Sequence, residues 1–417
     1  MLIHSASQLI TLAGAPQRGR DLGRLGIISN GAILIRDGLI LETGPTLDML
    51  NKYPDEERLD AENKAVLPGF VDPHTHLVWA GDRAAEFEMR LQGKTYMEIM
   101  AAGGGIASTV RETRTAEHES LLQQTRERAR RMFKQGTTTA EAKTGYGLHM
   151  DSELAQMEVL LRLDREGPLE IAPTFLAAHV IPAEFAGRED EYTNLIIEQM
   201  LPALKSFWDA KAGGKPLPFV DVFCERGAFS LDQTRRILTA AKRVGFPLKA
   251  HVDEFENLGG AALACELGAI SVDHAVRTSS EEIVKLGKSD TVVVSLPCTP
   301  FGLAETHYTP AQDLLAADAV LALATDLNPG TAWCESMQFV MALACRALKL
   351  TPAQALAAVT INAACAIGRQ DLVGSLEAGK QADLLILTVE DYRHLAYRFG
   401  GNLVNTIIKK GLVFSDF

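Results

Sequence analysis

The sequence lacks several patterns that would place it in a common class of protein. Its six cysteines form no CxxC pair, and four of them lie in apolar segments where a reduced thiol packs as a small hydrophobic group. No apolar run approaches the ~20 residues that cross a bilayer, and residues 1–5 do not begin a signal-like segment with basic residues. These absences predict a soluble protein of a reducing compartment, the cytoplasm.

Basic charge and nucleotide-binding motifs are also scarce. The chain has 41 lysines and arginines against 53 aspartates and glutamates, a formal net charge of -12. Nucleic acids and anionic membranes attract basic surfaces, so we expect neither as a partner, and a small anionic substrate would need a local cation. The sequence contains no P-loop, and no GxGxxG opens a helix after a strand. This argues against nucleotide chemistry and against a doubly wound dinucleotide-binding fold.

The middle of the chain alternates short apolar runs with segments of helical periodicity. The eight runs precede His74 or span 137–142, 171–178, 219–224, 247–250, 269–273, 291–296 and 320–325. Strands separated by helices form parallel sheets with right-handed crossovers, and eight repeats close into a barrel. We therefore predict an α/β fold of the (β/α)₈ TIM-like type, with a large core supported by 47% hydrophobic residues.

Both ends of the chain have a different character. Residues 31–40 read as a strand, an Asp-Gly turn and a second strand, and the same style returns in 382–387 and 406–413. Neither end has enough strands to be stable alone. We expect residues 1–63 and 375–417 to pair into a small composite β-sandwich domain beside a barrel of residues 64–374.

Two histidines at the end of the first apolar run are candidate metal ligands. Side chains at positions i and i+2 of a strand share a face, so His74 and His76 can point at one ion. Neutral imidazoles suit a borderline divalent metal such as zinc or iron. An isolated HxH is more often a plain polar strand end. Further ligands elsewhere in the chain are therefore needed to support a metal site.

Chemically capable residues recur at the predicted carboxyl ends of the other strands, which is where reacting groups converge in a barrel of this type. Five of the ten histidines stand at such ends. Alone, a single His reads as a core residue and an Asp before Asn-Pro-Gly as a turn former. The number of such residues at the predicted strand ends makes a chance distribution improbable. The full set is His74, His76, Glu141, Lys143, Tyr146, His179, Glu225, His251, Glu254, His274 and Asp326.

These residues also carry a resemblance to a known family. The segment 67–76, together with His251, His274 and Asp326, resembles the amidohydrolase superfamily of metal-dependent barrels with a flanking β-sandwich. More specifically, four separate segments resemble the imidazolonepropionase family of histidine degradation, and the resemblance runs nearly the whole length. These segments are 74–83, 143–147, 251–254 and 325–331.

The resemblance implies one divalent metal, zinc or iron. Many members of the superfamily hold two metals bridged by a carboxylated lysine, but here His179 and Glu225 stand at the ends of strands three and four. A second ion bridged by Glu225 stays open. Three imidazoles and one carboxylate leave a position for water. The implied ligands are His74, His76, His251 and Asp326.

The resemblance also implies the reaction, hydrolysis of the cyclic amide C–N bond of 4-imidazolone-5-propanoate to N-formimino-L-glutamate by a metal-bound hydroxide. Asp326 is then both a ligand and the proton acceptor. His274 either hydrogen-bonds the nucleophile or oxyanion, or orients a ligand. Glu254 is a further catalytic group that can accept from ring N–H groups.

Substrate contacts follow from the same resemblance. The guanidinium of Arg83 fits the propanoate carboxylate, with a surface salt bridge as the plainer alternative. Gly330 allows its backbone to approach the ligand closely, although Asn328 to Gly330 also reads as an ordinary turn. The implied contacts are Arg83, Tyr146, His179, Glu254, Asn328, Gly330 and Thr331.

Other functions fit part of the sequence. Another cyclic-amide hydrolase, or a deaminase of a nucleobase-like ring, could use the same metal residues on the same scaffold. A barrel without catalytic activity could serve as an assembly subunit. A homodimer is compatible with the sequence, although no motif indicates one.

Overall fold

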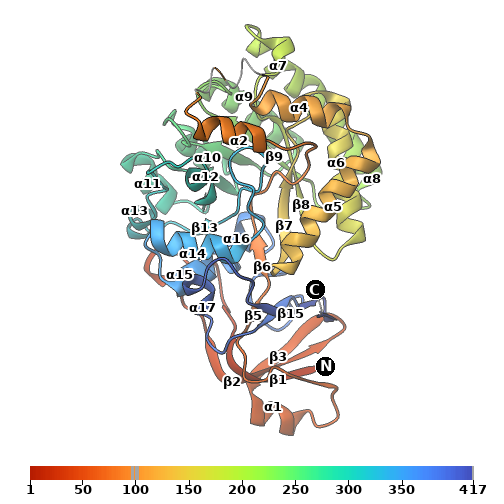
Figure 1. Cartoon of the computed structure of the whole chain (residues 1–417), viewed down its shortest axis with the longest axis vertical. Helices are drawn as coiled ribbons and strands as arrows, with labels where there is room; N and C mark the ends of the chain where they lie inside the picture. Colours follow the sequence, from red (N-terminus) through yellow and green to blue (C-terminus); the bar gives the residue numbers. More distant parts are fainter. Residues whose placement is uncertain (95–97, 99–102, 416–417) are drawn as a thin grey trace.

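The computed structural model describes residues 1–94, 98 and 103–415. It has two parts, which Figure 1 shows one above the other. The larger part is a barrel of strands surrounded by helices. The smaller part is mainly β-structure and holds both the N-terminus and the C-terminus.

Eight parallel strands stand side by side in chain order around the barrel. Each overlaps one of the eight apolar runs, so the predicted barrel is confirmed. The strands are β6 (Phe70–Asp72), β7 (Thr137–Lys143), β8 (Glu170–Ala178), β9 (Phe219–Cys224), β10 (Lys249–Val252), β11 (Ser271–His274), β12 (Val292–Ser295) and β13 (Leu321–Leu323). Their burial on both faces explains why apolar residues predominate in most of the runs, although β7 and β11 also bury polar and charged side chains.

The barrel closes between its first and last strands just beyond their carboxyl ends. The backbone N–H of His76 donates to the carbonyl of Leu327 at 2.9 Å, and the N–H of Asp326 donates to the carbonyl of His74 at 3.2 Å. Lower in this seam, Asp72 accepts from the Thr325 hydroxyl at 2.5 Å. The contacts that complete the barrel therefore lie at its mouth, among the candidate metal ligands.

Helices cover the outside of the barrel, and α2 (Ala84–Leu91) lies near its upper end in Figure 1. Ser230 and Ser279 begin two of the outer helices with reciprocal capping boxes, which satisfy free N–H groups of the first turn. Among the described residues, none of the helices is long and apolar enough to cross a membrane. The outer helices are α4 (Ile106–Thr115), α5 (His118–Lys134), α6 (Met150–Glu166), α7 (Glu189–Leu195), α8 (Leu201–Lys211), α9 (Leu231–Val244), α10 (Gly260–Leu267), α11 (Ser280–Gly287), α12 (Cys298–Gly302), α13 (Ala311–Ala316), α14 (Met337–Ala347), α15 (Pro352–Ala358) and α16 (Ile361–Ala366).

Strands from both ends of the chain form the second sheet, as predicted. Its order is β16-β15-β14-β5-β1-β2-β3, with β4 beside β1. Apolar side chains from both termini share one core, including Ile33, Leu384 and Ile408. Two short helices, α1 (Thr46–Lys52) and α17 (His394–Tyr397), accompany the sheet strands β1 (Leu2–Ile10), β2 (Ile27–Arg36), β3 (Leu39–Pro45), β4 (Arg58–Asp60), β5 (Val66–Pro68), β14 (Leu384–Leu387), β15 (Val404–Lys409) and β16 (Leu412–Phe414).

The apolar run before His74 is divided between the two sheets. β5 pairs with β14 of the terminal sheet, and β6 pairs with β7 of the barrel. Gly69 separates them, and a Cβ at this position would overlap the side chain of Thr138. The absence of a side chain therefore lets the chain pass directly from one sheet into the other.

Candidate metal centre

The four implied metal ligands meet at the carboxyl end of the barrel. His74 and His76 follow β6, His251 lies in β10 and Asp326 follows β13. All four are buried, with at most 3% of each residue exposed. Asp326 has a left-handed backbone with φ 55°, a conformation that costs a non-glycine residue on the order of 1–3 kcal/mol and is common at functional sites.

Three separations between candidate ligand atoms are those expected around a single ion. Asp326 Oδ1 lies 3.4 Å from His74 Nε2 and 3.6 Å from His76 Nε2. His76 Nε2 lies 3.3 Å from His251 Nε2. Ligand atoms about 2.1 Å from a tetrahedral ion lie about 3.4 Å from one another. These three separations match that value. Among the described residues, the groups whose ligand atoms all lie within 4.8 Å of one another are His74, His76 and Asp326, and His74, His251 and His274.

The protonation states of these groups also suit a cation. Burial lowers the pKa of His74 and His76 well below the ordinary value, so both imidazoles are neutral and keep a lone pair. Within the described part of the chain, the buried His74 Nε2 and Asp326 Oδ1 form no hydrogen bond. Buried polar atoms normally have a partner, and a divalent cation would serve both.

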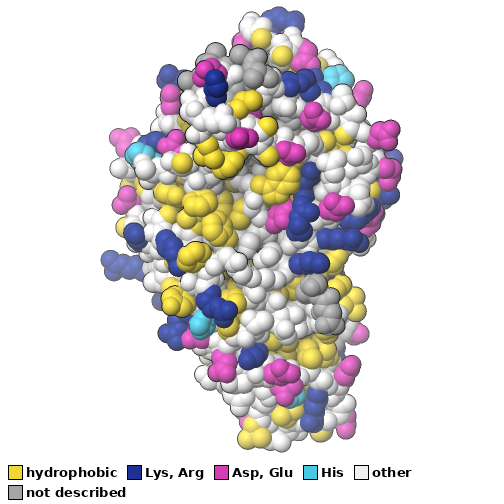
Figure 2. Space-filling view, in the orientation of Figure 1, with side chains coloured by type: hydrophobic (Ala, Val, Ile, Leu, Met, Phe, Trp, Pro, Cys, Tyr) yellow, Lys and Arg dark blue, Asp and Glu magenta, His cyan; other side chains and the backbone are white. Residues whose placement is uncertain are grey.

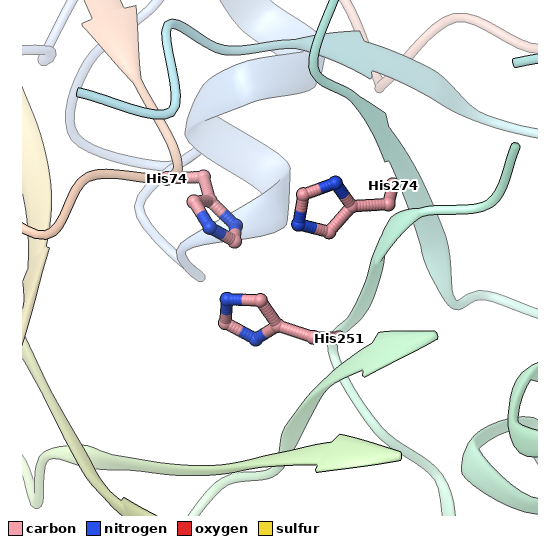
Figure 3. Close-up of side chains that lie close together, drawn as sticks. All are labelled: His74, His251 and His274. Carbon is pink, nitrogen blue, oxygen red and sulfur yellow. The ribbon is translucent and has the colours of Figure 1, made fainter. Parts of the chain in front are cut away.

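His274, the last residue of β11, faces the same space. Figure 3 shows its ring together with those of His74 and His251, each from a different strand or strand end. Nitrogens of these three histidines lie within 4.8 Å of one another. His274 Nε2 also lies 3.5 Å from Glu254 Oε2. Its ring can therefore reach both the metal position and an acidic neighbour.

Two acidic residues that the sequence did not single out contact imidazoles of the candidate metal ligands. Asp273 Oδ2 lies 2.6 Å from His74 Nδ1, and Asp221 Oδ2 lies 3.0 Å from His251 Nδ1. Carboxylates in this position orient a ligating imidazole and set its tautomer. The available signal was an aspartate inside an otherwise apolar strand, where an acidic side chain needs a buried partner.

Burial raises the pKa of Glu254 well above its usual range, and the nearby carboxylates of Asp326 and Glu225 add to this effect. Glu225 accepts hydrogen bonds from the backbone of two loops. Its two carboxylate oxygens accept backbone N–H groups of Arg226, Phe255 and Glu256, at 2.8, 2.9 and 3.3 Å. Glu225 therefore fixes the loop that carries Glu254.

Tyr146 and His179 lie beside the metal position. The His179 ring stacks on that of His76 with centroids 4.9 Å apart, and the Tyr146 ring lies 5.9 Å from it. His179 Nδ1 contacts the Gly145 carbonyl at 3.0 Å, which orients the ring. The structure brings both residues to the site, next to a metal ligand.

Arg83 is paired with Glu86, and the cavity that Arg83 lines includes none of the candidate metal ligands. Its Nε donates to Glu86 Oε2 at 2.9 Å, and its Nη2 contacts the other oxygen. Arg83, Gly330 and Thr331 line a cavity of about 520 Å³. A Cβ on Gly330 would overlap Arg83 Nη1, so the glycine makes room for the guanidinium.

Asn328 organises the loop after the eighth strand. Its Oδ1 accepts the N–H groups of Gly330 and Thr331, each at 2.8 Å, and its Nδ2 donates to the Asp326 carbonyl at 2.7 Å. This is the side-chain-stabilised turn that the sequence offered as the plainer alternative. The side chain therefore holds Asp326 and Gly330 in register.

Comparison with known proteins identifies relatives along the whole chain. Residues 65–413 match the amidohydrolase family. An imidazolonepropionase of Chloroflexus aggregans is 49% identical, covering 99% of this chain and 98% of its own length. Imidazolonepropionases of Herpetosiphon aurantiacus and Geobacillus kaustophilus are 48% and 46% identical, over 99% of this chain and 96% and 97% of theirs.

Solved structures share the fold at low sequence identity. A zinc-bound adenosine deaminase from Xanthomonas campestris has a TM-score of 0.73 at 19% identity, covering 99% of this chain and 92% of its own. A 5-methylcytosine deaminase from Klebsiella pneumoniae has a TM-score of 0.72 at 18% identity, covering 100% and 98%. These similarities concern the fold alone.

Proposed function

Because the chain belongs to the amidohydrolase family and, within it, to the imidazolonepropionases, we propose that its barrel mouth hydrolyses the cyclic amide C–N bond of 4-imidazolone-5-propanoate. The product is N-formimino-L-glutamate, in histidine degradation. The observation that carries this proposal is the convergence of three imidazoles and one carboxylate in a chain 49% identical to a relative of that name.

His74, His76, His251 and Asp326 would hold one divalent cation, zinc or iron. Support comes from their separations of 3.3–3.6 Å and from two buried ligand atoms without a hydrogen bond among the described residues. When bound, the cation lowers the pKa of a water molecule and polarises the amide carbonyl.

The proton moves through residues of this chain. Asp326 Oδ2 is held by the Thr299 hydroxyl, which leaves Oδ1 toward the ligand imidazoles and able to accept the proton of the attacking water. The same carboxyl then returns that proton to the ring nitrogen that leaves. His274, neutral because burial lowers its pKa, donates an N–H to the developing oxyanion.

The remaining contacts hold the substrate. Glu254 hydrogen-bonds the imidazolone ring, and Tyr146 and His179 enclose it beside His76. Arg83 binds the propanoate carboxylate from the cavity next to Gly330 through Nη1, because Nε and Nη2 contact Glu86. Thr331 lines the same cavity.

The test is an assay on freshly prepared imidazolone propanoate combined with elemental analysis of the purified protein. We expect substrate consumption with formation of N-formimino-glutamate, no ammonia, and about one zinc or iron per chain. Ammonia release would instead identify a ring deaminase. A folded protein without metal or turnover would favour an assembly subunit.

We also propose a homodimer and a cytoplasmic location for this enzyme. Hydrophobic side chains gather on the face shown in Figure 2, and exposed aromatic residues line a cavity of 550 Å³ beside α12 and α14. They include Phe301, Trp333 and Phe399, which are 55%, 48% and 63% exposed. Apolar patches of this kind mark interaction surfaces. Sedimentation velocity at two protein concentrations tests the dimer.

A further inference from the structure

A cluster of buried charges lies inside the barrel and takes no part in the steps above. It consists of three carboxylates and two ammonium groups, and each residue is at most 1% exposed. Charges buried this deeply are retained only when they are paired. The members are Glu141, Lys143, Asp221, Lys249 and Asp273.

Lys143 is the centre of this cluster. Its Nζ lies 2.7 Å from Glu141 Oε1, 2.8 Å from Asp221 Oδ2 and 3.5 Å from Asp273 Oδ2. Burial by itself lowers the pKa of Lys143, but the three carboxylates together outweigh burial and raise it above the ordinary value. The ammonium of Lys143 therefore stays charged. Its N–H groups are directed at carboxylates of the protein.

The same two carboxylate oxygens also touch the metal-binding imidazoles. Asp273 Oδ2 is hydrogen-bonded to His74 Nδ1 at 2.6 Å. Asp221 Oδ2 lies 3.0 Å from His251 Nδ1 as an electrostatic contact, because among the described residues this nitrogen forms no hydrogen bond. A neutral imidazole that donates from Nδ1 carries its lone pair on Nε2. In both histidines Nε2 is the atom directed at the metal position, as described above.

We propose that Lys143 is a positioning residue of the metal centre: through Asp221 and Asp273, one ammonium orients both His251 and His74 so that each presents Nε2 to the same cation. The proposal rests on the metal site proposed above. Lys143 acts on its neighbours and touches neither substrate nor cation. The two ligands come from strands far apart in the chain, and this ammonium links their orientations.

Lys249 provides a matched control, because it is an equally buried lysine in the same barrel. Its Nζ donates to the Pro73 carbonyl at 3.1 Å and lies 3.6 Å from Asp273 Oδ2, about as close as Lys143 at 3.5 Å. It does not contact Asp221 in the described structure. If the metal centre depends only on positive charge in the cluster, replacing either lysine should weaken zinc binding equally. If it depends on a lysine that contacts both Asp221 and Asp273, replacing Lys143 should weaken zinc binding more than replacing Lys249.

The experiment compares Lys143→Met with Lys249→Met. Zinc is titrated into each metal-free protein against a competing chelator, and Co²⁺ spectra report the ligand geometry. We expect Lys143→Met to weaken zinc binding about 10–100-fold, the range for loss of a group that orients a metal ligand. Its Co²⁺ absorption should change and its kcat should fall with little change in KM. Lys249→Met should show a much smaller loss of zinc affinity.

Several outcomes would overturn the proposal. A folded Lys143→Met with the wild-type zinc affinity and Co²⁺ spectrum would do so, and so would equal losses in the two variants. If Lys143→Met does not fold, Asp221→Asn and Asp273→Asn test the same links, and unchanged zinc affinity in both would refute it. A wild-type protein that binds no zinc or iron and lacks turnover would instead refute the proposed function.

Discussion

The two ends of the barrel each contain a buried lysine between carboxylates, and the two clusters differ in what else those carboxylates touch. At the mouth, Lys143 lies 2.7–3.5 Å from Glu141, Asp221 and Asp273. At the opposite end, Lys409 of the terminal sheet lies 2.9 Å from Glu170, the first residue of β8, and 2.7 Å from Asp383. The ion-pair chemistry of the two clusters is similar.

Their remaining partners separate the two roles. Asp221 and Asp273 contact imidazoles, which need an orienting group to bind a cation. Glu170 contacts Arg369 at 3.1 Å and Gln381 at 2.9 Å, so its carboxylate joins the barrel to the segment that leads into the terminal sheet. We infer that the mouth cluster serves chemistry and the junction cluster serves stability.

The largest expected effect is at the mouth. His251→Ala removes a ligand and should abolish metal retention and turnover together, with the fold retained. Elemental analysis and the substrate assay check this, and His118→Ala on α5 is a matched control outside the mouth. Full activity in His251→Ala would show that His251 is not a metal ligand. The inference that the mouth cluster serves chemistry would then fail.

Lys409→Met should lower the stability of the fold and leave turnover unchanged. It leaves Glu170 and Asp383 without their shared cation, and we expect a loss of about 2–3 kcal/mol in the free energy of unfolding, somewhat less than for a fully buried pair. Turnover per folded molecule should be unchanged. Denaturant unfolding and kcat measure the two effects.

Lys410→Met is the control for this variant. Its Nζ lies 3.5 Å from the same Glu170 oxygen, but the side chain is 53% exposed. An exposed pair contributes below about 1 kcal/mol. Equal losses for the two lysines would mean that burial does not distinguish the junction cluster.

Arg83→Ala tests the mouth without touching the metal ligands. Loss of a charged hydrogen bond to the substrate costs about 1.5–3 kcal/mol, so KM should rise about 10–150-fold while zinc content is unchanged. Gly330→Ala should give a smaller rise, since its methyl group would displace Arg83 Nη1. Arg235→Ala, on the exposed face of α9, is the control, and an unchanged KM in Arg83→Ala would exclude the clamp.

The smallest expected effect is the acid response of the junction. Burial alone would raise the pKa of Glu170, but Lys409, Gln381 and Arg369 outweigh it and lower the pKa to about 2 from 4.5. A depressed folded-state pKa stabilises the fold above pH 4.5, and this contribution is lost as pH falls toward 2. We expect the ionised Glu170 carboxylate to contribute on the order of 1–3 kcal/mol to the free energy of unfolding at neutral pH.

Comparing wild type with Glu170→Gln isolates this contribution. The difference in unfolding free energy should be largest near neutral pH and shrink on acidification. A difference independent of pH would mean that the Glu170 carboxylate does not titrate as proposed. Glu266→Gln, at an exposed pair with Arg235, should show little difference at any pH.

Local pattern was sufficient for much of this description. All eight barrel strands overlap apolar runs visible in the sequence, because a strand buried on both faces is mostly apolar, even where it also buries paired charges such as Lys143 and Asp273. The placement of histidines at strand ends was equally visible. The turn role of Asn328 appeared only as an alternative, since its hydrogen bonds depend on how the loop folds back.

The sequence by itself determined the barrel, the pairing of the two termini and the kinds of side chain at the strand ends, because these depend on periodicity over a few residues. Only the tertiary structure decided which side chains meet. His74 and Asp273 are 199 positions apart, Arg83 occupies the space left by Gly330, and one apolar run divides between two sheets at Gly69. Such contacts depend on strand register and on barrel closure, which no local pattern encodes.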